Sequence, residues 1–172
     1  KASSMQIPLI LAAYPWPNKG TIADIAGGNG HLLRSFVTTS EGVSGIVFDL
    51  PSTIATAKSH WEVGDVMHTD RVKFVAGDFF ESVDVVADMY VLKWVLHDWP
   101  DDRCIKILSN IRAAAPKGSC VVIIDMLVPE NELNSYHISK FFDMHMAAGY
   151  GGKERTSSDM RAIAESAGWA VQ

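Results

Sequence analysis

Three carboxylates stand at the ends of short apolar runs, where the side chains of a parallel sheet can meet a ligand. Asp24 lies just before a glycine-rich turn, and Asp49 and Asp78 follow the next two runs. Taken singly, each carboxylate is also typical of a helix N-cap or a turn. Together they favour a binding site, because Asp24 suits an ammonium group, Asp49 the hydroxyls of a ribose and Asp78 the amino group of an adenine.

The turn at Gly27–Gly30 follows Asp24 and precedes apolar residues at helical spacing. Its glycines let the backbone approach a ligand, and the helix start behind them offers free N–H groups. A dinucleotide-binding fingerprint needs a glycine where Leu33 stands, so a nicotinamide cofactor is disfavoured. With Phe79 offering an aromatic face beside Asp78, the pattern indicates a nucleoside that carries a cationic tail.

A further group of polar residues surrounds a histidine. Lys93, Trp94, His97 and Asp98 all follow another apolar run. A single histidine is more often structural than catalytic, but this one lies at a predicted strand end beside the proposed nucleoside site. An imidazole with the ordinary pKa of about 6.5 can take a proton from a phenol near neutral pH. If the segment is helical, Lys93 lies one turn before His97 on the same face.

Short apolar runs alternate along the chain with stretches whose apolar residues recur at helical spacing. The alternation predicts an α/β fold, a doubly wound and mostly parallel sheet of Rossmann-like type that binds ligands at the carboxyl ends of its strands. The predicted strands are Thr21–Ala26, Val43–Phe48, Val72–Ala76, Asp84–Tyr90 and Cys120–Met126. Helices are predicted after Gly30, Pro51 and Pro100, over Ser135–Ala148, and from Thr156–Ser158 to Gly168.

Length and composition fit one compact globular domain, since 48% of the 172 residues are hydrophobic and 20% are charged. The net charge of −5 argues against a nucleic-acid partner. The longest apolar run, Pro8–Tyr14, is too short to cross a membrane and lacks a signal-peptide pattern. Cys104 and Cys120 are isolated and the histidines form no convincing cluster with acids, so we expect free thiols, no metal and a cytoplasmic location.

Five motifs in order resemble one known family across about residues 20–168. They are Asp24–Gly30, Asp49-Leu50-Pro51, Gly77–Phe80, Leu92-Lys93 with Leu96–Trp99, and Gly151–Thr156. This series is similar to that of the family containing caffeic acid and acetylserotonin O-methyltransferases. The resemblance implies a class I methyltransferase sheet of seven strands, about five of them in this chain. It also implies transfer of a methyl group from S-adenosylmethionine to a hydroxyl of a small aromatic molecule, leaving S-adenosylhomocysteine.

The resemblance also implies roles for individual residues. The residues implied to bind the cofactor are Asp24, Gly27, Gly28, Gly30, Asp49, Leu50, Asp78, Phe79 and Lys93. The histidine of the fourth motif, His97, is implied to be the general base, and two carboxylates, Asp125 and Glu154, are implied to flank and orient it. The residues implied to line the phenolic pocket are Trp94, Met144, Met146 and Asp98.

Two residues depart from the family pattern. Asp125 stands where the family usually has the longer glutamate, so we expect Glu154 to be the closer partner of His97. Ala26 stands where many members have glycine. An alanine is tolerated there if its φ is negative, and we expect weakened cofactor contact rather than none.

The chain reads as a piece of something longer. Residues 1–19 are expected to be a linking segment or helix, and 20–172 a cofactor-binding catalytic domain that is incomplete at its C-terminus. Trp169 would begin a sixth strand, and the N-terminal dimerisation domain of the family is not seen. We expect a homodimer for the complete protein, and poor stability or oligomerisation for this piece alone.

Two alternative functions remain open from the sequence. A member of the family can keep the cofactor but hydroxylate or decarboxylate an aromatic polyketide, and a partial chain can bind cofactor or a partner without catalysis. The presence of His97 and Glu154 favours methyl transfer.

Overall fold

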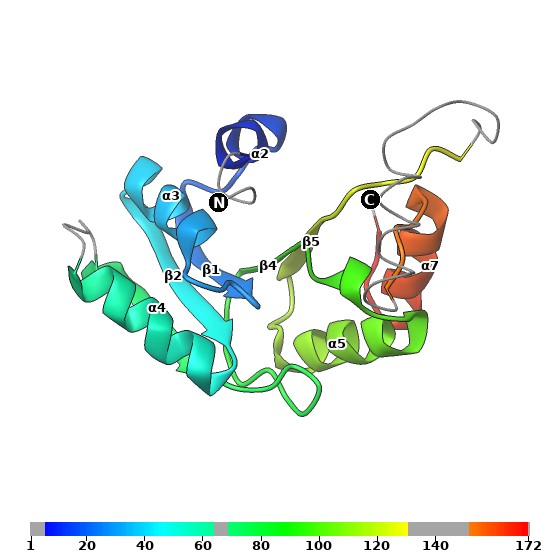
Figure 1. Cartoon of the computed structure of the whole chain (residues 1–172). Helices are drawn as coiled ribbons and strands as arrows, with labels where there is room; N and C mark the ends of the chain where they lie inside the picture. Colours follow the sequence, from blue (N-terminus) through cyan, green and yellow to red (C-terminus); the bar gives the residue numbers. More distant parts are fainter. Residues whose placement is uncertain (1–5, 64–68, 131–151, 172) are drawn as a thin grey trace.

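The computed structural model of the chain describes residues 6–63, 69–130 and 152–171. They form an α/β fold around one sheet of five strands in the order β3-β2-β1-β4-β5 (Figure 1). Every neighbouring pair is parallel, which confirms the predicted doubly wound sheet. The strands are β1 Lys19–Ile25, β2 Gly42–Asp49, β3 Val72–Ala76, β4 Met89–Lys93 and β5 Cys120–Ile124.

Helices cover both faces of the sheet, because alternate strand residues point into two separate cores. In β1, Ile22 belongs to the core shared with α3 and α4, whereas Ala23 and Ile25 belong to the core shared with α5 and α7. The α-helices are α2 Ile7–Ala13, α3 His31–Thr39, α4 Pro51–Val63, α5 Asp101–Ala114 and α7 Ser157–Ser166. Two short 3-10 helices, η1 Thr69–Arg71 and η2 Leu96–Asp98, complete the described elements.

The fourth strand is displaced from its predicted range, Asp84–Tyr90, because β4 begins only at Met89. In the segment before it, buried Val85 and Ala87 alternate with exposed residues, a pattern that imitates a half-buried strand. Around Val85 and Ala87 the backbone is held by a side chain, and hydrogen bonds to the neighbouring strands begin only at Asp88, whose N–H donates to the Thr21 carbonyl at 3.0 Å. The Tyr90 hydroxyl accepts from the Ala87 N–H at 3.2 Å and donates to the Val85 carbonyl at 3.0 Å.

The C-terminal part contains the predicted last helix, but not a strand at Trp169. Thr156 caps α7, and Gly168, with φ of 83°, follows its end as predicted. Trp169 was expected to open a sixth strand, but within the described residues it lies outside any strand. Its indole is 8% exposed and donates to the Leu108 carbonyl at 3.0 Å, so it packs against α5 as a core residue. The helix predicted at Ser135–Ala148 lies outside the described residues.

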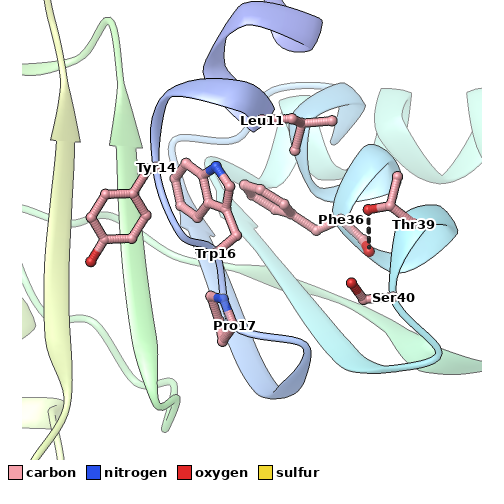
Figure 2. Close-up of a pocket in the computed structure, with 7 residues that line it drawn as sticks. All are labelled: Leu11, Tyr14, Trp16, Pro17, Phe36, Thr39 and Ser40. Atoms are coloured by element: carbon pink, nitrogen blue, oxygen red, sulfur yellow. Dashed lines mark hydrogen bonds between the residues drawn. The ribbon is translucent and has the colours of Figure 1, made fainter.

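The expected linking segment contains α2 and packs on α3 through a row of aromatic rings (Figure 2). The Trp16 ring lies 4.5 Å from that of Phe36 and 4.9 Å from that of Tyr14. The indole N–H of Trp16 donates to the Ile10 carbonyl at 2.9 Å, which ties the segment back onto its own helix. In the part of the chain that the structure describes, no helix is long and apolar enough to cross a membrane.

Candidate active site

The polar residues singled out in the sequence meet at one edge of the sheet. Across the strand order they are Asp78, Asp49, Asp24, Lys93 and Asp125, each at or just after the carboxyl end of its strand. The register places them level, since β1 and β2 pair up to Ile25, and β4 and β5 pair up to Lys93. The strand order reverses between β1 and β4, and open α/β sheets bind ligands in the crevice at that point.

The glycine turn after β1 is built on left-handed backbone. Gly28 and Gly30 have φ of 57° and 71°, and Ala26 has φ of 55°. The condition under which an alanine is tolerated at this position, a negative φ, is therefore not met, and the left-handed backbone of Ala26 costs roughly 1–2 kcal/mol. A Cβ at Gly27 would lie 2.8 Å from the carboxyl carbon of Asp24, whereas one at Gly28 would meet nothing within 4 Å. The turn thus closes over Asp24 and leaves the side of Gly28 open.

Asp24 is a buried acid with 3% exposure. Burial above all raises its pKa to about 7, a value that already includes the opposing ammonium group of Lys93 and the reinforcing charge of Asp49. Burial in turn lowers the pKa of Lys93, against the attraction of Asp24 and Asp125. A carboxyl group in this state gains from a second cation, because the cation favours its charged form.

Asp49 is fixed by two backbone N–H groups. Gly28 donates to its Oδ2 at 2.9 Å and Leu50 donates to its Oδ1 at 2.7 Å. Each oxygen keeps a second lone pair, so the carboxylate can accept two further hydrogen bonds at a fixed orientation. The turn itself is anchored to α4, because the Trp61 indole donates to the Asn29 carbonyl at 2.8 Å.

Asp78 and Phe79 follow β3. The Oδ1 of Asp78 accepts from the Phe80 N–H at 2.8 Å, so the turn-forming role considered for this residue is present. The Phe79 ring lies 4.8 Å from Phe80 and 6.2 Å from Trp99, in the turn that carries the histidine. The aromatic contacts therefore join the loop after β3 to the loop after β4.

His97 lies in η2 and pairs with Glu154, a residue 57 positions away. The Nδ1 of His97 is 3.1 Å from Oε1 of Glu154, and the two side chains are 15% and 3% exposed. If Nδ1 donates its proton to this carboxylate, Nε2 keeps a lone pair and can act as a base. Nε2 lies 3.5 Å from Oδ1 of Asp98, whose side chain is 47% exposed.

Asp125 stands apart from this pair. Neither of its buried oxygens has a hydrogen-bond partner within the described residues. Burial, helped by the charge of Glu154, raises its pKa to about 6 against the opposing charges of His97 and Arg155. The carboxyl is thus near enough to act on His97 electrostatically, but Glu154 makes the contact, as the shorter side chain of Asp125 led us to expect.

Lys93 and Trp94 lie at the turn from β4. Lys93 ends the strand, so the helix considered over Lys93 and His97 does not form. Trp94 has φ of 56°, a rare value for a bulky residue, and its ring lies 6.2 Å from that of His97. Its backbone N–H donates to the Ile124 carbonyl at 2.9 Å. The other predicted pocket residues, Met144 and Met146, lie outside the described residues.

Sequence reasoning missed Arg155, which is 1% exposed in the structure. It stands in the motif Gly151–Thr156, but nothing in its residue type distinguishes it from the exposed Lys153 two positions earlier.

Comparison with known proteins gives a consistent picture. The family model described as the O-methyltransferase domain matches residues 1–170. The O-demethylpuromycin-O-methyltransferase of Streptomyces alboniger is 35% identical over 157 residues, which cover 91% of this chain and 41% of that protein. Two crystal structures described below have the same fold over nearly the whole chain.

Human N-acetylserotonin methyltransferase in complex with S-adenosylmethionine matches with a TM-score of 0.85 and 28% identity, over 96% of this chain and 46% of that chain. An O-methyltransferase from neocarzinostatin biosynthesis, in complex with S-adenosyl-L-homocysteine and 1,4-dihydroxy-2-naphthoic acid, matches with a TM-score of 0.84 and 33% identity. That match covers 98% of this chain and 51% of the other. The chain thus spans about half the length of the solved structures it matches, and somewhat less of the puromycin relative.

Proposed function

This chain belongs to the O-methyltransferase domain family, and on that premise we propose that it transfers a methyl group from S-adenosylmethionine to a hydroxyl of a small aromatic molecule. We propose His97 as the general base. The observation that carries the proposal is the contact of 3.1 Å between His97 Nδ1 and Glu154 Oε1, next to the edge where the strand-end carboxylates gather.

The residues at this edge fit the cofactor. The buried carboxyl of Asp24 suits the ammonium group of the methionine moiety, and the open side of Gly28 gives room beside it. Asp49, with both oxygens oriented by backbone N–H groups, suits the two hydroxyls of the ribose. Phe79 offers a ring face for the adenine, and Asp78 an acceptor for its amino group.

The proposed chemistry asks little of the protein beyond alignment and proton removal. When bound, S-adenosylmethionine supplies an electrophilic methyl group on a sulfonium centre. A phenol, with a pKa of about 10, must lose its proton during or before attack. Nε2 of His97 accepts that proton, and Glu154 stabilises the imidazolium through Nδ1, which also fixes the tautomer. The ring of Trp94, 6.2 Å from that of His97, can contact the aromatic ring of the substrate.

The test uses the complete protein, radiolabelled S-adenosylmethionine and 1,4-dihydroxy-2-naphthoic acid with a panel of phenols and catechols. His97→Gln should lower the rate by about a hundred- to ten-thousand-fold and leave the affinity for S-adenosylhomocysteine almost unchanged. Glu154→Gln should lower it less. Both losses should shrink as the pH rises towards about 10, where the phenolate forms without a base.

His60→Gln is the matched control, since His60 is exposed on α4 with its Nδ1 3.0 Å from the Thr56 carbonyl. A His97 variant with the full rate at pH 7 would remove the base assignment. Cofactor that binds without losing its methyl group, together with a hydroxylated or decarboxylated product, would support the alternative chemistry. Binding without any product would support a non-catalytic role.

We further propose a cytoplasmic homodimer for the complete protein, in keeping with the family. Sedimentation of the complete protein at micromolar concentration tests the dimer, which a monomeric mass would exclude.

A further inference from the structure

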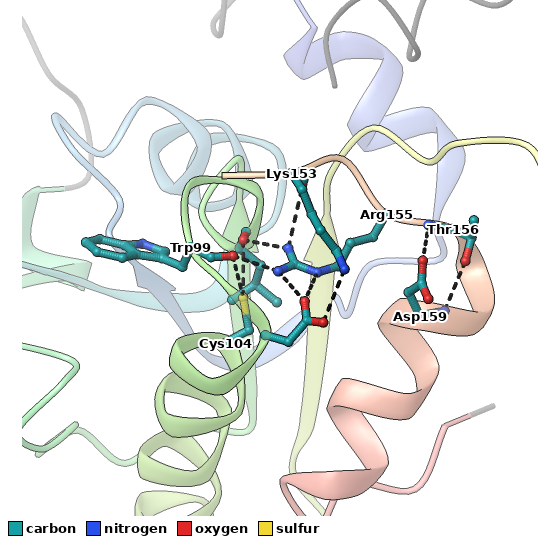
Figure 3. Close-up of polar contacts among 8 residues, drawn as sticks. Trp99, Cys104, Lys153, Arg155, Thr156 and Asp159 are labelled. Carbon is teal, nitrogen blue, oxygen red and sulfur yellow. Dashed lines mark hydrogen bonds and ion pairs between the residues drawn. The ribbon is translucent and has the colours of Figure 1, made fainter. Parts of the chain in front are cut away.

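Arg155 is a charged side chain in an almost fully buried position, with 1% exposure. A buried guanidinium costs several kcal/mol unless its donors are paired. Here they are paired on three sides. Nε and Nη2 donate to Oδ1 of Asp101 at 2.9 and 2.8 Å, Nη1 donates to the Leu96 carbonyl at 2.8 Å, and Nη2 also donates to the Trp99 carbonyl at 2.6 Å (Figure 3).

The two carbonyls bracket the proposed base. Leu96 opens η2 and Trp99 is its C-cap, so His97 lies between them, and Asp101 opens the helix that follows. One side chain therefore holds the backbone before His97, the backbone after it, and the start of α5. The thiol of Cys104, three residues further along α5, lies 3.2 and 3.4 Å from the same two carbonyls and can donate to either.

The neighbouring residue, Glu154, contacts the imidazole ring of the same histidine through Nδ1. Glu154 and Arg155 are adjacent in the chain and contact the same turn at two places. Glu154 contacts the ring of His97, and Arg155 contacts the backbone carbonyls of Leu96 and Trp99. The backbones are also joined, because the Lys153 N–H donates to the His97 carbonyl at 2.9 Å. A Cβ at Gly152 would lie only 2.0 Å from that carbonyl oxygen, so the two segments are in direct contact.

From this geometry we propose that Arg155 is a positioning residue for the reaction, which clamps the turn at Leu96–Trp99 so that the imidazole of His97 meets Glu154 in one orientation. The proposal rests on the proposed function in assigning His97 as the base. A lysine cannot take over the role, because its single ammonium group lacks the planar fork that reaches two carbonyls and a carboxylate at once.

Lys153 provides the matched control. Its Nζ lies 3.2 Å from Oδ2 of Asp101, the carboxylate that Arg155 also uses, but both side chains of that pair are about half exposed. Lys153→Met thus removes one positive charge from the same segment and the same carboxylate, while its backbone N–H and the clamp stay in place. Arg155→Lys keeps the charge and removes the fork.

The experiment compares Arg155→Lys with Lys153→Met in the complete protein. Methyl transfer to 1,4-dihydroxy-2-naphthoic acid, or to whichever phenol of the panel is turned over, gives kcat and KM. We expect Arg155→Lys to lower kcat by about 10- to 100-fold with little change in KM, since a displacement of about 1 Å can cost a hundredfold. Lys153→Met should stay within about twofold of the unchanged protein.

A second readout needs no turnover. In protein labelled with ¹⁵N in its histidines and saturated with S-adenosylhomocysteine, the two ring nitrogens of His97 should report one fixed tautomer in the unchanged protein and in Lys153→Met. In Arg155→Lys they should report averaging between tautomers. This spectrum tests the clamp even if no substrate is found, so failure of the clamp and failure of methyl transfer are distinguishable.

An Arg155→Lys protein with the kcat and tautomer of the Lys153→Met protein would overturn the proposal. If Arg155→Lys does not fold, Asp101→Asn decides, because it weakens the hold on the guanidinium from a half-exposed position. A lower kcat and tautomer averaging in Asp101→Asn would support the clamp, and unchanged values would overturn it.

Discussion

Cofactor binding is expected to release a proton from Asp24. Burial raises the pKa of this carboxyl to about 7, so the group is close to half protonated at neutral pH before a ligand arrives. The ammonium group of the cofactor favours the charged form. Lys93 already favours the charged form in the free protein and Asp49 disfavours it, and the pKa of about 7 includes both influences.

The size of the effect follows from the pKa. If Asp24 is fully ionised in the complex, the apparent dissociation constant scales with one plus the ratio of protonated to ionised Asp24 in the free protein. From pH 6 to pH 7.5 the affinity should rise roughly eightfold, or about 1.2 kcal/mol, while proton release falls from roughly 0.9 to roughly 0.25 per site. The sign is that of a raised carboxyl pKa, in which affinity is lost as the pH falls through 7.

Titration calorimetry with S-adenosylhomocysteine measures both quantities, in two buffers of different ionisation heat at each pH. Asp24→Asn keeps the size of the side chain but cannot ionise, so it should bind more weakly and release no proton. Asp49→Ala is the control. It should weaken binding by about 1–3 kcal/mol, through loss of a hydrogen-bonded charge. Proton release should persist but shift to lower pH, because removing the charge of Asp49 lowers the pKa of Asp24. Equal affinity at pH 6 and 7.5 in the unchanged protein, or proton release that survives in Asp24→Asn, would refute the reasoning.

Three further predictions concern the scaffold. Ala26→Gly should raise the free energy of unfolding by about 0.5–1 kcal/mol in a denaturant titration, because relief of the left-handed strain exceeds the extra entropy that glycine gives the unfolded chain. The control Ala23→Gly, at a buried strand position, should lower the free energy of unfolding in the same titration. Tyr90→Phe should destabilise by about 1–3 kcal/mol in such a titration, because a buried backbone N–H loses its acceptor. Burial raises the pKa of Cys104 to about 11, so iodoacetamide at pH 8 should modify exposed Cys120 first, as mass spectrometry of the peptides would show.

The position of the site was predictable because it depends on strand ends. Parallel strands place their carboxyl ends at one edge, so Asp24, Asp49 and Asp78 could be grouped before any contact was known. The predicted start of the fourth strand was wrong because buried and exposed residues alternate before β4, as they would in a half-buried strand, whereas Met89–Leu92 of β4 itself are all buried. Periodicity reports which side chains are buried, and it does not report whether a neighbouring strand or a tyrosine hydroxyl satisfies the backbone.

The clamp was not predictable for a different reason. Lys153 and Arg155 are both basic residues of one motif, yet one is half exposed and the other is buried. What separates them is the pair of carbonyls at Leu96 and Trp99, more than fifty residues earlier, that only the arginine reaches. A contact of that sequence separation has no signature in local spacing.

Two residues with strained backbone conformations stand where β1 and β4 end. Among the described residues, Ala26 and Trp94 are the non-glycine residues with positive φ, and each stands directly after one of these two strands. The strands pair with each other up to Ile25 and Leu92. Beyond that point each chain keeps only a bond to its outer neighbour, since the Ala26 N–H donates to the Phe48 carbonyl of β2 at 2.8 Å and the Trp94 N–H donates to the Ile124 carbonyl of β5 at 2.9 Å.

The left-handed residues thus bend the two chains away from each other, towards the outer strands on either side. Strain of this kind persists only where the surrounding structure holds it, and it is concentrated at binding and catalytic sites. Here the bend after β1 carries the turn that closes over Asp24, and the bend after β4 carries the turn with His97. Because both bends start from the same level of the sheet, the strained backbone places the proposed cofactor site and the proposed base on the two sides of the point where the strand order reverses.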